Sequence, residues 1–393
     1  MSENNETSVS PEEQDTQEGT RASESVICYH PNGKLCERIE FSGGVAEGLW
    51  QKWDPRGQLV SECEWKGGRQ HGRQTQWFKN GEKSSEINWA DGKKHGSESL
   101  WSADGTPIRR IDWKLGIMHG IETIWHDNGQ KQTETAYEDG VMSGPVRAWF
   151  QTGIVKLEGD YRSGERFGEW SEWYGNGTKK LTGNYPDGSW SSWYRNGAKE
   201  SLGERLNGLE HGSWGYWDDK GNAVAEGNFK DGQKSGGWQH WYTNGQLKRA
   251  GGWNRGREHG DWSFWYPSGQ MKKSGGYYEG QEDGPWSHWY ENGNKAREGK
   301  WYRGREEGKW LTWYENGNVE REYEYLHGKW HGQRVLYRED GQKESEGFFE
   351  EGKREGVWVA YHPNGQLRSE VEFENDRQKP GMKLWAEDGR KLR

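Results

Sequence analysis

Six histidines recur directly before a glycine, and a repeated histidine is first of all a candidate metal ligand. They are His71, His95, His119, His211, His259 and His331. Zinc ligands must all approach one ion to about 2 Å. If each histidine belongs to one β-hairpin of a repeated series, equivalent side chains lie about 10 Å apart, because two strand spacings separate them. The sequence therefore predicts turn residues at these positions, and no bound metal or cofactor.

Patterns that would carry catalysis are also missing from the sequence. The acidic pair Glu306-Glu307 is adjacent in the chain, so we expect two solvated carboxylates and not a pair that faces itself across a cleft. The sequence contains no Gly-x-Ser-x-Gly or His-Glu-x-x-His motif, and no phosphate-binding glycine loop that opens a helix. We therefore expect a protein that is not an enzyme.

The elements that position these residues follow from a repeat anchored on glycine. Fourteen of its fifteen intervals are 24 residues long, and the interval from Gly177 to Gly197 is 20. Such fixed self-similarity is typical of repeat architectures. The anchor glycines are Gly33, Gly57, Gly81, Gly105, Gly129, Gly153, Gly177, Gly197, Gly221, Gly245, Gly269, Gly293, Gly317, Gly341, Gly365 and Gly389.

Each repeat has room for two strands and two turns. Asn or Asp usually precedes the anchor glycine, which predicts a tight type I′ hairpin turn, and a looser turn follows at Gly-x-x-x-Gly. The fold class is therefore all-β, an elongated single-layer antiparallel sheet solenoid of tandem hairpins. We predict an acidic, disordered tail over residues 1–25 and about fifteen tandem hairpins over 26–393, the last of them degenerate as a cap.

Composition supports a core built from aromatic side chains. The chain has 28 Trp and 18 Tyr, and each can bury roughly 150–250 Å². The formal net charge is −9, much of it in the first 25 residues, so no basic face indicates nucleic-acid binding. The three cysteines form no disulfide or zinc pattern, and no apolar run reaches the length of a membrane span. With no signal-peptide pattern at Met1, we expect a cytoplasmic protein.

Several repeats read Trp-x-x-Trp-Tyr before the anchor turn. Because strand side chains alternate faces, the first Trp and the Tyr are expected to share one face and the second Trp to take the other. The first Trp varies along the chain, which suggests a surface that is used for binding or is merely exposed. The candidate partner-binding residues are Trp170, Tyr174, Trp214, Trp238, Tyr242, Trp262, Tyr266, Trp286, Tyr290, Trp310 and Tyr314.

The combined pattern, aromatic-x-x-Gly-x-x-x-Gly-x-Trp-x-x-Trp-Tyr-x-Asn-Gly, resembles the MORN-repeat variant found in tandem in bacterial proteins. The resemblance covers residues 29–393 and includes the His-Gly pairs. Within that variant the chain is most similar to the YwqK-type group, which is described as antitoxin components. The resemblance implies an extended, twisted, essentially single-layer antiparallel sheet.

Three functions remain open on the sequence. The first is a non-catalytic protein-interaction scaffold, in its narrower form one that neutralises a cognate protein as an antitoxin does, since Trp and Tyr are favoured interface anchors. The second is a Trp-rich module that binds cell-wall carbohydrate or choline through its aromatic faces. The third is association with a membrane surface. The sequence favours the first, because the repeats are nearly neutral and no export signal is seen.

Overall fold

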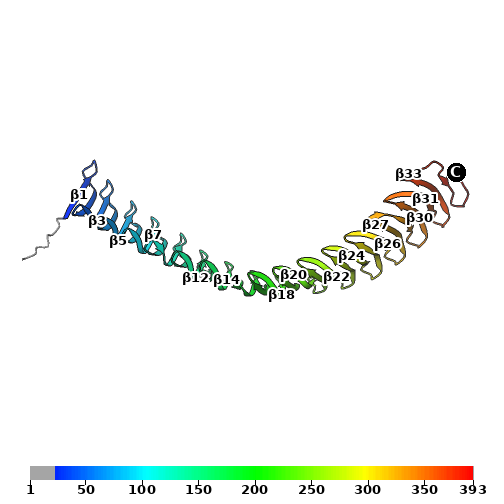
Figure 1. Ribbon diagram of the computed structural model, residues 1–393, viewed down its shortest axis with the longest axis horizontal. Coiled ribbons are helices and arrows are strands. Elements are labelled where there is room, and N and C mark those ends of the chain that lie inside the picture. Colours follow the sequence, from blue (N-terminus) through cyan, green and yellow to red (C-terminus); the bar gives the residue numbers. More distant parts are fainter. Residues whose placement is uncertain (1–22, 393) are drawn as a thin grey trace, which may run out of the picture. The chain divides into compact units, whose positions relative to one another are not determined.

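The computed structural model describes residues 23–392, and this part of the chain is built from 34 β-strands and the turns between them. It divides into two compact units, the first ending at Glu165 and the second beginning at Arg166. In each unit the hairpins follow one another as a stack (Figure 1). The predicted tail lies almost wholly outside the described residues, and the first strand begins at Ser23.

The strands of the first unit have the following bounds. They are β1 (Ser23–Tyr29), β2 (Leu35–Ser42), β3 (Val45–Trp53), β4 (Leu59–Lys66), β5 (Arg69–Trp77), β6 (Lys83–Ala90), β7 (Lys93–Trp101), β8 (Pro107–Lys114), β9 (Ile117–Met118), β10 (Gly120–Trp125), β11 (Lys131–Glu138), β12 (Val141–Trp149) and β13 (Val155–Arg162).

The next strand, β14 (Glu165–Trp173), begins on the boundary, and the remaining strands belong to the second unit. They are β15 (Lys179–Tyr185), β16 (Gly188–Trp193), β17 (Lys199–Leu206), β18 (Leu209–Trp217), β19 (Ala223–Lys230), β20 (Gln233–Trp241), β21 (Leu247–Asn254), β22 (Arg257–Trp265), β23 (Met271–Tyr278), β24 (Gln281–Trp289), β25 (Lys295–Tyr302), β26 (Arg305–Trp313), β27 (Val319–Leu326), β28 (Lys329–Trp330), β29 (Gly332–Tyr337), β30 (Lys343–Glu350), β31 (Lys353–Tyr361), β32 (Leu367–Glu374), β33 (Arg377–Gln378) and β34 (Lys383–Leu384).

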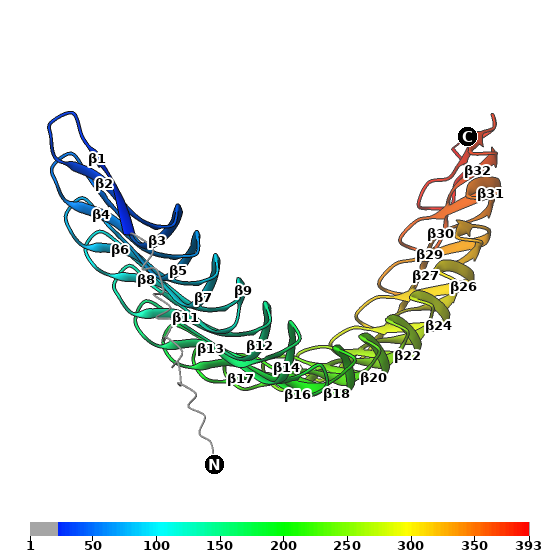
Figure 2. The same ribbon diagram turned by 60° about the vertical axis from the view of Figure 1, so that its left-hand side comes forward.

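Strands pair with their neighbours along the chain, always antiparallel. In the second unit, for example, β24 pairs with β23 on one side and with β25 on the other. The sheet is open, and among the described residues no helix or second sheet covers it (Figure 2). The predicted fold class, an all-β antiparallel sheet of tandem hairpins, is confirmed.

The turn at Asn-Gly differs from the predicted type I′ turn. Gly293 has a positive φ of 92°, whereas Asn292 does not adopt positive φ. The Gly293 N–H donates to the Tyr290 carbonyl at 3.0 Å, and the Tyr290 N–H donates to the Asn294 carbonyl at 2.8 Å. These bonds define a three-residue hairpin loop, a type I turn followed by a glycine bulge. The type I′ prediction was wrong because Asn is compatible with both turns.

The type I′ geometry occurs instead at the other end of each hairpin, where the sequence suggested a looser turn. Arg303 and Gly304 both have positive φ, 47° and 76°, and the flanking residues Tyr302 and Arg305 pair directly. A two-residue loop with positive φ at both positions matches the right-handed twist of the strands it joins. The non-glycine residue at its first position varies widely, so this turn has a weaker sequence signature.

A bulge lies opposite the second Trp of each repeat. The register between β24 and β25 shifts between His288, which pairs with Arg297, and Trp289, which pairs with Lys295. The extra residue is therefore Ala296 of β25, and an extra residue breaks the period of two on the strand that carries it. The strand that carries Trp286 and Trp289 has no extra residue at this position.

The core of the second unit consists of tryptophans that lie directly on glycines of the preceding strand. Gly275 pairs with Trp286, and a Cβ added to Gly275 would come within 2.1 Å of the Trp286 ring. Trp286 is only 1 % exposed. Tyr277 packs edge-on against Trp286, with ring centroids 5.2 Å apart. The pairs with this arrangement are Gly203/Trp214, Gly227/Trp238, Gly251/Trp262, Gly275/Trp286, Gly299/Trp310 and Gly347/Trp358.

The shortened repeat keeps the same packing. Trp190 pairs with Gly183, and its ring lies where a Cβ of Gly183 would be. Four residues are missing from this interval, and an even number preserves the inside–outside alternation. The expectation that this interval is a local tightening is consistent with the register.

One repeat of the first unit fills the same two positions with different side chains. Ile87 pairs with Glu98, which is 7 % exposed. The Glu98 carboxylate accepts hydrogen bonds from Lys94 Nζ, at 2.7 Å to each oxygen, and from Trp113 Nε1 at 2.8 Å. A buried charge is tolerated only when it is paired and hydrogen-bonded in this way. Where the second unit has glycine below tryptophan, this repeat has isoleucine beside an ion pair.

Candidate functional site

The six predicted partner-binding tryptophans are core residues. Trp170, Trp214, Trp238, Trp262, Trp286 and Trp310 are at most 4 % exposed. A partner cannot contact these rings unless the sheet rearranges. We therefore correct the interpretation that the first Trp of these repeats forms an exposed surface, because in all six repeats its ring is buried in the sheet.

The predicted tyrosines connect each hairpin to the next. The Tyr290 hydroxyl donates to the Trp313 carbonyl at 2.7 Å. Tyr174, Tyr242, Tyr266 and Tyr314 make the equivalent bond to the carbonyl at the same position of the following repeat, at 2.8–3.0 Å. These side chains are half-buried. Their clearest role is to hold successive Asn-Gly turns in place.

Removal of one such hydroxyl has a modest expected effect. Tyr290→Phe should lower the free energy of unfolding by about 0.5–1.5 kcal/mol, because one intramolecular hydrogen bond is lost. Urea denaturation followed by circular dichroism would measure it. Tyr302→Phe is the matched control, since Tyr302 is 54 % exposed and should give no change. Equal effects of the two changes would contradict the bracing role.

The loop histidines also connect repeats. The N–H of Leu115 donates to His95 Nδ1 and that of Asp139 to His119 Nδ1, both at 3.4 Å. In other repeats an acidic side chain accepts the same bond, as Glu307 does from the His327 N–H at 2.9 Å. The prediction of turn residues is wrong for four of the six, because His71, His95, His211 and His259 lie within strands β5, β7, β18 and β22. Among residues 23–392, no three His, Cys, Asp or Glu side chains are grouped as a metal site would require.

A row of cations and aromatic rings crosses five strands of the second unit, from β20 to β24. His240 pairs with Arg249, Arg249 with Phe264, Phe264 with Lys273, and Lys273 with His288. Side chains that pair directly across antiparallel strands lie on one face. We call these five residues the cation–aromatic row.

The cations of this row lie on the core tryptophans. Lys273 Nζ is 4.7 Å from the ring centroid of Trp286 and 4.6 Å from that of Phe264. The Arg249 guanidinium is 5.6 Å from the centroid of Trp262. Cations over aromatic faces gain roughly 0.5–2 kcal/mol, depending on how far they are removed from water. This layer explains why the tryptophans below are closed to solvent.

A pocket of about 390 Å³ opens beside the row, and we call it the basic pocket. It has four cationic residues in its lining and no carboxylate. Arg249 and Lys273 are half-buried, and Lys248 and Lys272 are exposed. The lining residues are Val224, His240, Trp241, Tyr242, Lys248, Arg249, Phe264, Trp265, Lys272 and Lys273.

The carboxylates nearest to the pocket offset only part of its charge. Glu258 Oε1 lies 3.8 Å from Arg249, and Glu282 Oε1 lies 3.6 Å from Lys273. No ion pair is found for Lys248 or Lys272 among the described residues, and Lys248 lies 5.4 Å from the Tyr242 ring centroid. The arrangement therefore suits an anionic group that also contacts aromatic rings.

The two histidines of the row are neutral at pH 7. Burial, together with Lys273, Arg297 and Lys272, lowers the pKa of His288 to about 4. Burial, together with Arg249, Lys234 and Lys248, likewise lowers the pKa of His240 to about 4. The positive charge of the basic pocket thus comes from lysine and arginine.

This shift predicts a loss of stability in mild acid. The ordinary pKa of histidine is near 6.5. Below that pH, the His288 side chain binds a proton in the unfolded chain but stays neutral in the folded protein. Stability is fully present above about pH 6.5 and declines as the pH falls toward 4. His288→Gln should flatten the decline between pH 7 and 5 in urea denaturation. An NMR titration of His288 in the folded protein with a midpoint near 6.5 would contradict the lowered pKa and the acid dependence that follows from it.

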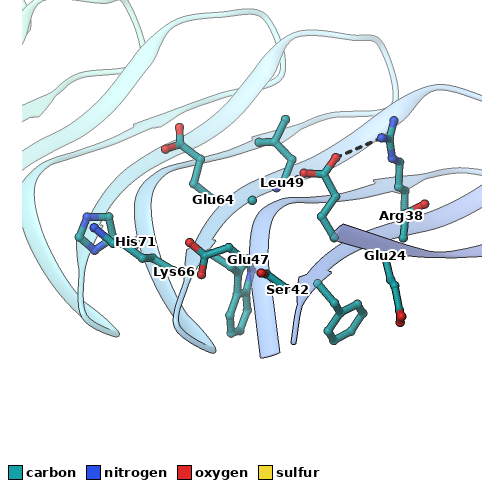
Figure 3. Close-up of a pocket in the computed structure, with 13 residues that line it drawn as sticks. Glu24, Arg38, Ser42, Glu47, Leu49, Glu64, Lys66 and His71 are labelled. Atoms are coloured by element: carbon teal, nitrogen blue, oxygen red, sulfur yellow. Dashed lines mark hydrogen bonds and ion pairs between the residues drawn. The ribbon is translucent and has the colours of Figure 1, made fainter. Parts of the chain in front are cut away.

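A second pocket, of about 880 Å³, lies in the first unit and is rich in carboxylates (Figure 3). Glu40 accepts hydrogen bonds from Arg38 at 3.1 Å and from the Leu49 N–H at 3.2 Å, and Glu47 accepts one from the Gly67 N–H at 2.7 Å. These carboxylates are therefore used in holding the strands together.

Comparison with protein families identifies the repeat. The family model for the MORN repeat variant matches six segments, residues 46–66, 118–139, 258–279, 282–301, 306–327 and 354–375. The chain therefore contains repeats of the MORN variant in these segments. The matched segment 282–301 falls on β24, β25 and the Asn-Gly turn between them, so one MORN repeat corresponds to one hairpin. The match identifies the repeat and not the narrower YwqK-type group.

Solved structures add no functional argument for this MORN-repeat protein. The Photorhabdus luminescens Tc holotoxin pore is 10 % identical, with 94 % of this chain and 23 % of that chain covered and a TM-score of 0.16. A TcdB2-TccC3-Cdc42 structure is 10 % identical, with 93 % and 28 % covered and a TM-score of 0.14. The chain spans about a quarter of the length of these proteins. No curated protein matches it.

No membrane-crossing helix is found in the part of the chain that the structure describes. All of its regular structure between residues 23 and 392 is strand.

Proposed function

We propose that this MORN-repeat protein is a non-catalytic scaffold that binds another protein through the surface of its sheet. The observation that carries the proposal is the basic pocket, in which four cations and the rings of Trp241, Tyr242, Phe264 and Trp265 share one opening. Interfaces between proteins are enriched in Trp, Tyr and Arg. The sheet around it has no covering layer among the described residues, so an extended partner has access.

A non-catalytic role is supported by the hydrogen bonds that the acidic and histidine side chains make within the sheet. The Glu306 carboxylate is held by Arg297 at 2.8 Å, and Glu307 accepts the His327 N–H. Among the histidines, His95 and His119 accept backbone N–H groups, and His71 lies close to Asp91 of the next turn. Groups already engaged in the sheet are poorly placed to transfer protons to a substrate.

The proposal is tested by capture and reconstitution. The full chain, immobilised, should retain one protein from its own cell extract at a stoichiometric amount, and the purified pair should bind in calorimetry. Cell-wall glycans, choline and vesicles serve as parallel ligands. Binding to one of these without any protein partner would overturn the proposal in favour of a wall-binding or membrane-surface role.

Neutralisation of a toxic partner is the narrower form of this proposal, and it is supported by the resemblance to the YwqK-type group. The captured protein should then arrest growth when it is produced alone, and co-production of this chain should restore growth. If the captured protein does not arrest growth when it is produced alone, the antitoxin role is excluded and the scaffold role remains. We place the complex in the cytoplasm, which cell fractionation would test.

A further inference from the structure

We propose that the basic pocket binds an extended acidic segment of the partner, with two carboxylates three residues apart. The inference rests on the proposed function and specifies the chemistry of its partner. One carboxylate would lie between Lys248 and Arg249 of β21, and the other between Lys272 and Lys273 of β23. Phe264 of β22 pairs with one cation of each strand, Arg249 on one side and Lys273 on the other.

The distance between the cation pairs sets the spacing of the acids. Lys248 and Arg249 are separated from Lys272 and Lys273 by one repeat, that is by two strand spacings. This distance is about 10 Å. Two negative groups at this spacing can each contact one pair, whereas a single small anion contacts both only when the side chains of both strands turn toward it.

An extended peptide meets this requirement at one spacing. In the polyproline II conformation, residues i and i+3 point to the same side and lie about 9.3 Å apart. In a β-strand, residues i and i+2 share a face but are only about 6.8 Å apart, and residues i and i+3 point to opposite faces. The pocket therefore favours acid-x-x-acid in a polyproline II segment.

The pocket also offers polar groups without a partner. His240 Nδ1 is buried and has no hydrogen-bond partner among the described residues, and His240 lines the pocket. Lys248 and Lys272, exposed and without an ion pair in the described part of the chain, can turn toward a ligand at little cost. The rings of Trp241 and Trp265 provide apolar walls for the residues between the acids.

The test uses fluorescence polarisation with the full chain and three labelled peptides. Each peptide holds two Glu in a Pro- and Ser-containing sequence, spaced by two, three or four residues. The three-residue spacing should bind most tightly, and binding should weaken as salt is raised from 0.05 to 0.5 M, because exposed ion pairs are screened. Equal affinity for all three spacings would overturn the proposal.

Charge variants identify the site. Lys248→Glu with Lys272→Glu changes two exposed side chains, so folding should be unaffected, and affinity for the three-spaced peptide should fall about tenfold or more. Lys230→Glu is the matched control, an exposed lysine outside the pocket that should leave binding unchanged. Circular dichroism confirms the fold of each variant. Unchanged affinity of the double variant would overturn the site.

The chain itself has acids at this spacing in its sequence, Glu12, Asp15 and Glu18. The full chain with Glu12→Gln, Asp15→Asn and Glu18→Gln should bind the three-spaced peptide with the same affinity as the unchanged chain. A tenfold gain in affinity would show that these residues already occupy the pocket, and would overturn an external partner as its ligand. If the partner is captured but the double variant still binds it, the scaffold role stands and the pocket assignment fails.

Discussion

Trp286→Ala is expected to lower the free energy of unfolding of the second unit by about 3–5 kcal/mol. The indole is 1 % exposed, packs on Gly275, and donates a hydrogen bond from Nε1 to the Gly276 carbonyl at 3.0 Å. Deleting a buried tryptophan removes its burial and leaves a cavity that glycine cannot fill. Urea denaturation with hydrogen exchange would give the size of the loss and locate it in β23 and β24.

The matched control is Tyr302→Ala, an aromatic of the neighbouring hairpin that is 54 % exposed and should cost no more than about 0.5 kcal/mol. A Trp286→Ala protein as stable as this control would contradict the core assignment. The same result bears on partner binding. If core tryptophans were changed to test a binding surface, lost binding would report unfolding, so the exposed lysines are the better probe.

Gly275→Ala is expected to destabilise the protein by about 1–3 kcal/mol, although alanine is the smallest possible addition. The new Cβ would lie 2.1 Å from Cδ2 of Trp286 and within 2.4 Å of two further ring atoms. Real Cβ atoms do not approach ring atoms so closely, and overpacking of a tight core typically costs this amount. The Trp286 ring would have to move, together with the layer of Lys273 above it.

Gly237→Ala is the control for this change. Gly237 also lies in a strand, β20, but a Cβ there meets nothing within 4 Å. Alanine at that position should be neutral or slightly stabilising, since it reduces the freedom of the unfolded chain. The chain also suggests a rescue: Thr135 pairs with Val146 at the corresponding positions of the first unit. Gly275→Thr with Trp286→Val should recover stability relative to Gly275→Thr alone.

The hairpin architecture was predictable because its signals are local. The anchor glycines, the aromatic periodicity and the spacing of 24 residues each depend on one turn or one strand. The turn types were less predictable. Asn-Gly is compatible with type I′ and with the three-residue loop around Gly293, and the sequence does not show that Asn292 keeps negative φ.

The exposure of the first Trp was predicted wrongly for a physical reason. A variable Trp was interpreted as exposed, but Trp286 faces Gly275, which leaves room for the ring to lie flat on the sheet and be buried. The pairing of these two positions depends on the register of two strands, which the sequence of one strand does not show. The basic pocket could not be found from the sequence, because Lys248 and Lys272 look like ordinary surface lysines until the fold places them in one pocket with Phe264.

The paired positions of the core also limit how such a chain can gain or lose repeats during evolution. Gly275 and Trp286 both lie between the anchor glycines Gly269 and Gly293, and the turn at Glu279 and Gly280 separates them. Recombination with breakpoints at the Asn-Gly turns copies both members of a pair, and the duplicate can fold at once. A breakpoint at the two-residue turn separates the glycine from its tryptophan and can place a larger residue opposite the ring; where the chain pairs Ile39 with Trp50, the ring is only half-buried. The exchangeable block of this gene is therefore the segment from one anchor glycine to the next.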